Sequence, residues 1–173
     1  GDVITAWRGP FKGEQDFIIN KILIEVKSQL SDKDSVVNFS SAAQLDTVSG
    51  TIFISNNKIS TVSDDNPEGM SLNKIIKEVN SKIKNEPDTI IDTFEAGLLE
   101  LGYQESDQYE INKFCLQKKD YYEVEKNFPC LRGSELPPEI SKVSYSINLD
   151  SCSDFKVEED KVFKEMMNEK LWR

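Results

Sequence analysis

Three side chains near the start of the chain could act together in one reaction, namely Asp16, Glu25 and Lys27. Asp16 precedes the apolar run FIIN, and Glu25 and Lys27 lie two residues apart where the run ILIEV ends. Residues i and i+2 of a strand point to the same face, so this pair is predicted to project together. Carboxylates and a lysine that converge can hold a divalent metal and polarise a water molecule beside a phosphate.

A β-hairpin is the element that would bring the three side chains together. Residues 15–20 and 21–29 read as strands joined by a turn at Asn20-Lys21, which would place Asp16 across from Glu25. Val26 would point back into the apolar layer and offer its backbone carbonyl as a further ligand. The predicted site is a metal held by Asp16, Glu25 and the Val26 carbonyl, with Lys27 beside the water.

The short pattern itself is weak evidence for such a site. An acidic residue two positions before a lysine occurs at Glu25, Asp154 and Glu159, about as often as this composition gives by chance. Asp154 and Glu159 fall at or in a predicted helix, where residues i and i+2 do not share a face. The other interpretation of Glu25 and Lys27 is an exposed pair that meets water, and of Asp16 a simple turn residue.

The composition limits the classes of protein. The chain has 173 residues, enough for one domain with a real core, and a net charge of −10, which argues against a basic, sequence-independent nucleic-acid coat protein. With no histidine, the sequence excludes His-based acid–base chemistry and catalytic triads. Its three separated cysteines read as free thiols in a reducing compartment, and no apolar run approaches a membrane span, so we expect a cytoplasmic protein.

The rest of the chain divides into predicted strands and helices, both of which an α/β (α+β) fold contains. Further strands are predicted at 36–40, at 51–61 with a turn at Asn56-Asn57, at 109–117 and 121–131 around a Lys-Lys-Asp turn, and at 140–149. A short helix is predicted at 40–50, capped by Ser40 or Ser41 and ended by Gly50.

Three longer helices follow from apolar spacing. One starts near Ser71 and turns one face inward: Leu72, Ile75, Ile76, Val79 and Ile83. The second, within 86–103, is capped by Asp88 or Thr89 and ended by Gly102. The last closes the chain with an inward face: Phe163, Met166, Met167 and Leu171.

The arrangement D16-x8-E25-V-K27 resembles the motif of the PD-(D/E)XK phosphodiesterase superfamily, with Gln15 where the name has proline. The segments AWRGPFKGEQDF, IEVKS, SSAAQLD, GMSL, LGY, FPCL and LPPEISKVSYSINL, in this order, resemble a bacterial family of that superfamily. Its members are often found near DNA-modification and phage-defence proteins. The resemblance covers most of the chain.

The resemblance implies a restriction-endonuclease-like fold, a mixed central β-sheet flanked by helices. It also implies Asp16 and Glu25 as metal ligands, Lys27 as the catalytic lysine and Mg²⁺ or Mn²⁺ as cofactor. Gln44 falls where related nucleases often carry a functional glutamine, although a merely structural hydrogen bond is an equal interpretation. Relatives carry an earlier helix with a further glutamate, and only fifteen residues precede Asp16. We therefore expect a fragment, or another chain that supplies this part, and activity of this chain alone is in question.

The function expected from these residues is hydrolysis of DNA phosphodiester bonds, in restriction or phage defence. Arg8 and Lys12 flank a turn and could grip a phosphate backbone, although solvent-facing cations on a packed loop are the simpler interpretation. Residues 1–65 would form the nuclease core, and 66–173 a helical and β extension packed on the same domain. Expected partners are DNA and a second copy or other defence subunits. The rival interpretation is a non-catalytic restriction-like scaffold or interaction module.

Overall fold

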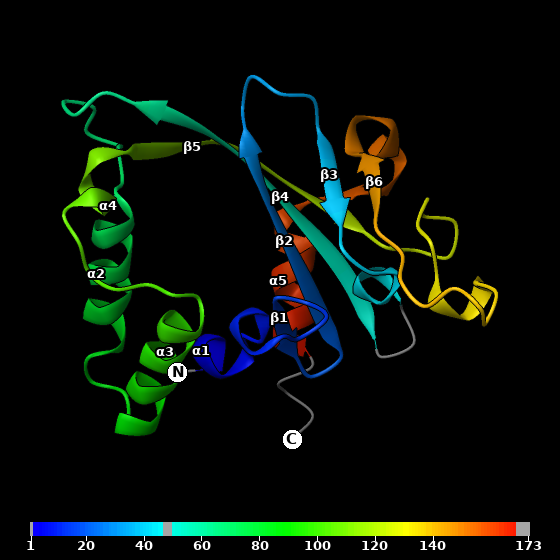
Figure 1. The fold of residues 1–173 in the computed structure, drawn as a ribbon, viewed down its shortest axis with the longest axis horizontal. Helices are drawn as coiled ribbons and strands as arrows, with labels where there is room; N and C mark the ends of the chain where they lie inside the picture. Colours follow the sequence, from blue (N-terminus) through cyan, green and yellow to red (C-terminus); the bar gives the residue numbers. More distant parts are fainter. Residues whose placement is uncertain (1, 47–49, 169–173) are drawn as a thin grey trace.

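A mixed five-stranded sheet organises the chain, in the strand order β1-β2-β4-β5-β7 (Figure 1). The computed structural model describes residues 2–46 and 50–168. The strands are β1 (Phe17–Ile19), β2 (Ile22–Leu30), β4 (Thr51–Val62), β5 (Lys113–Glu123) and β7 (Lys156–Val157). Only β2 and β4 are parallel, and the other neighbours are antiparallel. With helices flanking this sheet, the predicted α/β class and restriction-endonuclease-like fold are confirmed.

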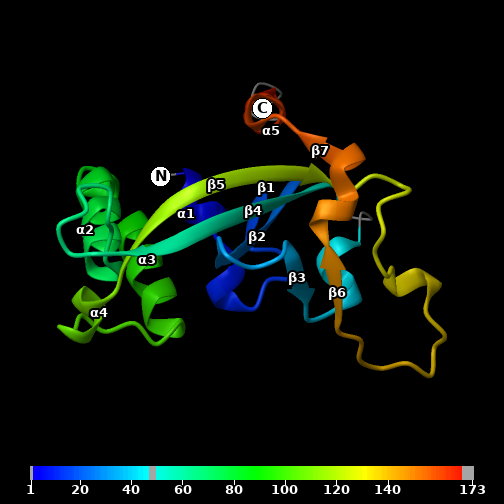
Figure 2. The same cartoon turned by 90° about the horizontal axis from the view of Figure 1, so that it is seen from above.

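A separate antiparallel ribbon, β3 (Val36–Phe39) with β6 (Tyr145–Asn148), covers one face of the sheet, while α5 (Glu159–Asn168) covers the other (Figure 2). The alternation of β2 explains the two layers. Leu23 packs with Phe39 under the ribbon, in the larger core, and Ile22 packs with Val162 under α5. Apolar residues on both faces make β2 a buried strand.

Helices α2 (Leu72–Ile83), α3 (Asp88–Glu100) and α4 (Gln108–Ile111) form a group at one end of the sheet (Figure 1). They connect β4 to β5. Their core includes Trp7, which follows α1 (Asp2–Ala6) and packs on Phe94 with ring centroids 5.9 Å apart. Trp7 therefore joins the helical group to the hairpin. The remaining elements are short 3-10 helices: η1 (Gly9–Phe11), η2 (Ala42–Leu45), η4 (Gly133–Glu135) and η5 (Leu149–Phe155).

The predicted hairpin is confirmed, with Phe17 opposite Ile24 and Ile19 opposite Ile22. Two predicted turns are wrong. β4 runs straight through Asn56-Asn57 because both neighbouring strands pair with it there, and the buried Asn56 amide oxygen accepts a hydrogen bond from Gln29 at 3.0 Å. β5 likewise runs through Lys118-Lys119-Asp120, where Lys118 and Lys156 neutralise the buried Asp120. The polar residues at these two points therefore lie within continuous, paired strands, and the chain does not reverse there.

Helix limits match the sequence in part. α2 begins as predicted, because the Ser71 hydroxyl accepts the Lys74 N–H at 3.1 Å. α3 ends before Gly102, which takes a left-handed φ of 76°, but its N-cap position is Pro87 rather than Asp88 or Thr89.

Three predicted helices need correction, beginning with α2, where Leu72 and Ile75 of the predicted inward face are 42% and 43% exposed. The helix at 40–50 is a single 3-10 turn, because the chain is extended again at Asp46, and residues 47–49 lie outside the described part. In α5 the buried stripe is Val162 and Met166, while Phe163 and Met167 are 47% and 66% exposed. Phe163 and Met167 each follow a residue of the stripe formed by Val162 and Met166, so their side chains are turned away from the sheet. Leu171 lies outside the described residues.

The predicted limit at residue 65 stays a prediction. Strands from both sides of it, β4 and β5, pair along most of their length in one sheet. The cysteines Cys115, Cys130 and Cys152 are free, as predicted, and Cys130 is only partly buried. Within residues 2–46 and 50–168, no helix is long and apolar enough to cross a membrane.

Candidate active site

The C-terminal half of β2 brings Glu25 and Lys27 onto the face that the ribbon covers. Leu23, two residues earlier on that face, is buried in the larger core, so the same alternation directs Glu25 inward to 2% exposure. The Lys27 Nζ atom lies 2.6 Å from Glu25 Oε1 and 4.7 Å from the centre of the Phe39 ring. The alternative of an exposed pair does not fit Glu25, which is buried, while the Lys27 side chain keeps 18% exposure.

Gln44 completes the surroundings of Glu25. Its Nε2 donates to Glu25 Oε1 at 2.7 Å, and its Oε1 accepts from the Ser40 N–H at 2.7 Å. Because the Ser40 donors fix which end of the amide is oxygen, the amide nitrogen is directed at the carboxylate. One Glu25 oxygen thus receives two donors, Lys27 and Gln44.

Asp16 lies at the point where β1 begins. Its Oδ2 accepts the Val26 N–H at 2.7 Å, so a side chain replaces the next rung of the β1–β2 ladder. In a strand the N–H and C=O of one residue face the same edge, so the Val26 carbonyl is directed to the Asp16 side. The hairpin thereby brings Asp16 and the Val26 main chain together, as the sequence predicted.

The loop before β1 holds Asp16 in place. The N–H groups of Arg8 and Gly9 donate to the Asp16 carbonyl at 2.7 and 3.1 Å. A Cβ atom on Gly9 would lie 2.7 Å from Asp16 Oδ1, closer than side-chain atoms approach one another. The absence of a side chain at position 9 is what leaves room for this carboxylate.

Sequence reasoning missed two residues of this site. The buried Gln15 donates to the carbonyl oxygens of Ala43 and Gln44, both at 3.1 Å, and so anchors η2 to the hairpin. Glu14 accepts a hydrogen bond from the hydroxyl of Ser41 at 2.9 Å, and Ser41 is the N-cap residue of η2 but makes no side-chain capping hydrogen bond. A polar residue in the motif's proline position was the available signal for Gln15.

The electrostatics of the site concentrate on Glu25. The pKa of its carboxyl is raised to about 7. Burial is the largest cause, the negative charges of Asp16 and Glu14 add to it, and Lys27 opposes it. The site therefore holds more negative charge than Lys27 neutralises. A bound cation would relieve this repulsion.

The donors present fit a hard divalent cation. Asp16, Glu25 and the Val26 carbonyl supply oxygen ligands, which Mg²⁺ accepts together with water. Among the described residues, no group of three or more acidic or cysteine side chains is arranged to hold a metal. Any metal here would depend on two carboxylates, the carbonyl and water.

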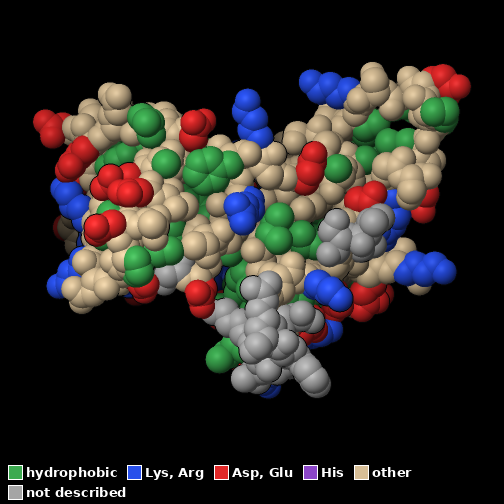
Figure 3. Space-filling view, turned by 90° about the horizontal axis from the view of Figure 1, so that it is seen from below, with side chains coloured by type: hydrophobic (Ala, Val, Ile, Leu, Met, Phe, Trp, Pro, Cys, Tyr) green, Lys and Arg blue, Asp and Glu red, His purple; other side chains and the backbone are tan. Residues whose placement is uncertain are grey.

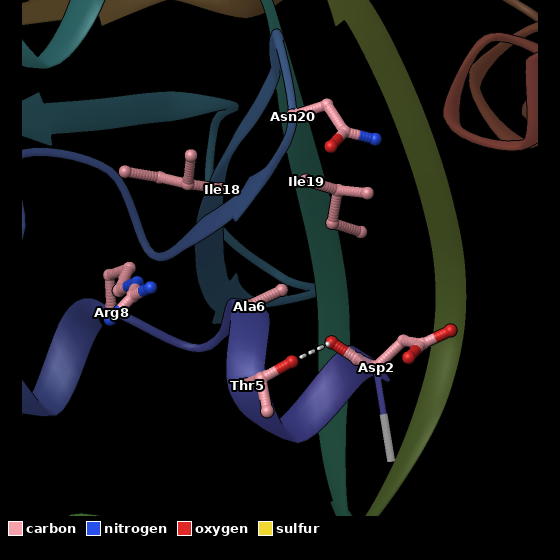
Figure 4. Close-up of a pocket in the computed structure, with 7 residues that line it drawn as sticks. All are labelled: Asp2, Thr5, Ala6, Arg8, Ile18, Ile19 and Asn20. Carbon is pink, nitrogen blue, oxygen red and sulfur yellow. Dashed lines mark hydrogen bonds between the residues drawn. The ribbon is translucent and has the colours of Figure 1, made fainter. Parts of the chain in front are cut away.

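Arg8 and Lys12 lie in the loop before Asp16. Arg8 lines a cavity of about 530 Å³ together with residues of α1 and of the hairpin. Figure 4 shows Arg8 on one side of this cavity, with Asp2 and Asn20 on the other. Lys12 is exposed at the end of η1 with a left-handed φ of 61°. Both side chains are close in sequence to Asp16 and accessible, and their predicted contact with nucleic acid stays a prediction.

The fold and these residues define a protein of the restriction-endonuclease-like class. A family model described as "Putative PD-(D/E)XK family member, (DUF4420)" matches residues 1–150, and the chain belongs to that family. Neither the curated proteins nor the solved structures include a match to this chain. The predicted superfamily is thereby confirmed.

Proposed function

We propose that this protein is a metal-dependent nuclease that hydrolyses DNA phosphodiester bonds, with Mg²⁺ or Mn²⁺ as cofactor. The observation that carries the proposal is the buried Glu25 carboxylate, held by Lys27 and Gln44 one residue from the main-chain amide that Asp16 binds. A purely structural ion pair would not need a glutamine on the same carboxylate oxygen, or a second carboxylate close enough to raise the pKa of the first.

The chain's own residues have distinct roles in this proposal. Asp16, Glu25 and the Val26 carbonyl would hold the cation, which supplies Lewis-acid stabilisation and an activated water. Lys27 offers its ammonium to the charge that develops on the phosphate oxygens. Gln44 fixes the orientation of Glu25, since its amide is itself fixed by Ser40.

Restriction or phage defence in the cytoplasm is the setting that we infer from the family resemblance. Cleavage of both DNA strands would favour a homodimer, and other defence subunits are further candidate partners. The acidic side chains gathered over the helical group (Figure 3) make that surface unfavourable for DNA. Four of them lie exposed along α3: Asp88, Asp92, Glu95 and Glu100.

The test combines metal binding with cleavage. Mn²⁺ should raise the melting temperature of the parent protein but not of Glu25→Ala, and Lys27→Ala should nick plasmid DNA about a hundredfold more slowly. Glu159 and Lys161 repeat the same local pattern away from the site, so Glu159→Ala and Lys161→Ala are matched controls. Equal nicking by the parent and Lys27→Ala would refute the proposed role of Lys27.

A non-catalytic scaffold is the second candidate, and one observation favours it. Asp16 Oδ2 and Glu25 Oε1 are both satisfied by donors from the chain itself, so the site is stable without a cation. In that case Mn²⁺ would leave the melting temperatures of the parent and Glu25→Ala equally unchanged, and neither would nick DNA.

A further inference from the structure

A second binding feature lies beside Lys27. A cavity of about 360 Å³ opens between β2 and the β3–β6 ribbon. Besides Lys27 it is lined from both ribbon strands: Asn38, Phe39, Ser40, Ser144, Tyr145 and Ser146. These two strand ends are more than a hundred residues apart in sequence, and the ribbon pairing brings them together.

The lining is unusual for so acidic a protein. It combines one ammonium group with hydroxyls and an amide, and it includes no carboxylate. The cavity beside α1 includes Asp2, the one beside η4 includes Glu123, and the one beside α2 includes Glu68. In a protein with a net charge of −10, a carboxylate-free cavity beside a lysine suits an anion better than those three cavities do.

The ribbon register fixes the polar groups on one side of the cavity. Asn38 pairs with Ser146, and the Ser146 hydroxyl donates to Asn38 Oδ1 at 2.6 Å, which leaves the Asn38 amide nitrogen as a donor. Ser144 lies two residues before Ser146. Within the described part of the chain, its hydroxyl has no hydrogen-bond partner.

Two stacked aromatic rings connect this cavity to the candidate active site. Phe39 and Tyr145 have ring centroids 5.4 Å apart, and the Lys27 ammonium lies over Phe39. Burial raises the pKa of Tyr145 to about 12, so its phenol stays neutral. An anion in this cavity would meet neutral donors and the Lys27 ammonium, which Glu25 shares from the other side, and the lining itself holds no carboxylate.

We propose that this cavity binds the phosphodiester that adjoins the scissile one in a nucleic-acid strand, with the Ser144 hydroxyl and the Asn38 amide nitrogen as its donors. The inference rests on the proposed function. Contacts of this kind position a strand without reading its bases. Because Lys27 borders both the cavity and Glu25, one nucleotide step would separate the bound phosphate from the reacting one.

The test measures binding of short fluorescein-labelled DNA duplexes of several sequences, with Ca²⁺ in place of Mg²⁺. Ser144→Asp places a carboxylate in the cavity and should weaken binding about tenfold for every sequence, and Ser144→Ala about threefold. Ser141→Asp adds the same charge at an exposed serine outside the lining and should stay within about twofold of the parent. Melting temperatures establish that all variants are folded.

The two proposals can fail separately. If the parent nicks DNA but Ser144→Asp binds duplex as tightly as Ser141→Asp, the cavity proposal is wrong and the nuclease proposal stands. If the parent never nicks DNA, yet Ser144→Asp alone loses binding, the cavity stands without catalysis. A loss confined to one duplex sequence, or no duplex binding by the parent, also overturns the cavity proposal.

Discussion

Glu25 carries its raised pKa even though the Lys27 ammonium lies 2.6 Å from its oxygen. At pH values between 4.5, the ordinary pKa of a glutamate, and about 7, the folded protein holds a proton at Glu25 that the unfolded chain releases. The unfolded state binds fewer protons in that window, so the free energy of unfolding falls as pH rises through it. Burying this carboxylate costs stability at neutral pH, as expected of a group retained for function.

Replacing Glu25 by glutamine should remove this pH dependence. We expect the free energy of unfolding of the parent to fall relative to Glu25→Gln by about 3 kcal/mol between pH 4 and pH 8. Urea denaturation in EDTA at several pH values measures the difference without metal. A gap between the two proteins that stays constant with pH would contradict the raised pKa.

Residue-level prediction from the sequence succeeded where a strand's period of two decides the outcome. It placed Glu25 and Lys27 on one face and Asp16 across the hairpin. It could not find Gln15, because that residue acts through two main-chain carbonyl groups of η2, which are 28 and 29 residues away. Its place in the motif's proline position was the one signal, because contacts to main chain add none in the types of the side chains.

At the scale of elements, the loop from η1 to β1 is as important as the strands. Gly9 approaches Asp16 so closely that any side chain there would displace the carboxylate, the mobile partner in the contact. The loop thereby sets how far Asp16 can move. Its contribution follows from backbone geometry, which glycine's small size permits.

Gly9→Ala should therefore keep the fold but weaken the site. We expect a loss of about 1–2 kcal/mol of stability and a clearly smaller rise in melting temperature on addition of Mn²⁺. Gly133→Ala is the matched control, because a Cβ there meets its nearest atom at an ordinary 3.6 Å. An undiminished Mn²⁺ shift in Gly9→Ala would show that the position of Asp16 is not critical for metal binding.

Element prediction failed at the two central strands for a shared reason. Asn56-Asn57 and Lys118-Lys119-Asp120 have turn-like composition, but they lie opposite one another in β4 and β5. Strand pairing holds both segments extended, and Lys118 and Lys156 supply the counter-charges of the buried Asp120. A single-sequence rule examines one segment at a time and cannot detect this pairing.

At the scale of the whole molecule, a small contact ties the helical group to the site-bearing sheet. Trp7 lies between the hairpin, where it bridges to Phe17, and α3, where it packs against Phe94. A Cβ on Gly97 of α3 would come within 2.8 Å of the Trp7 ring. Glycine at position 97 lets the helix approach this closely.

Gly97→Ala should destabilise the protein by about 1–3 kcal/mol, although alanine favours a helix by about 1 kcal/mol over glycine. The cost should largely vanish in a Trp7→Leu background, where the smaller side chain leaves room. A double-mutant cycle of urea denaturation measures this coupling. Equal costs of Gly97→Ala in both backgrounds would mean that the helix contact does not depend on Trp7.

The hydrogen bond between Asp16 and Val26 has a consequence for isotope labelling. At the end of the β1–β2 ladder a carboxylate, rather than a strand, protects this amide proton from deuterium in the solvent. Its exchange rate therefore reports the state of Asp16 directly. A bound ion that draws Asp16 away would expose the amide and speed its labelling. The exchange rate of the Val26 amide proton would therefore show whether an ion occupies the site, before any substrate is known.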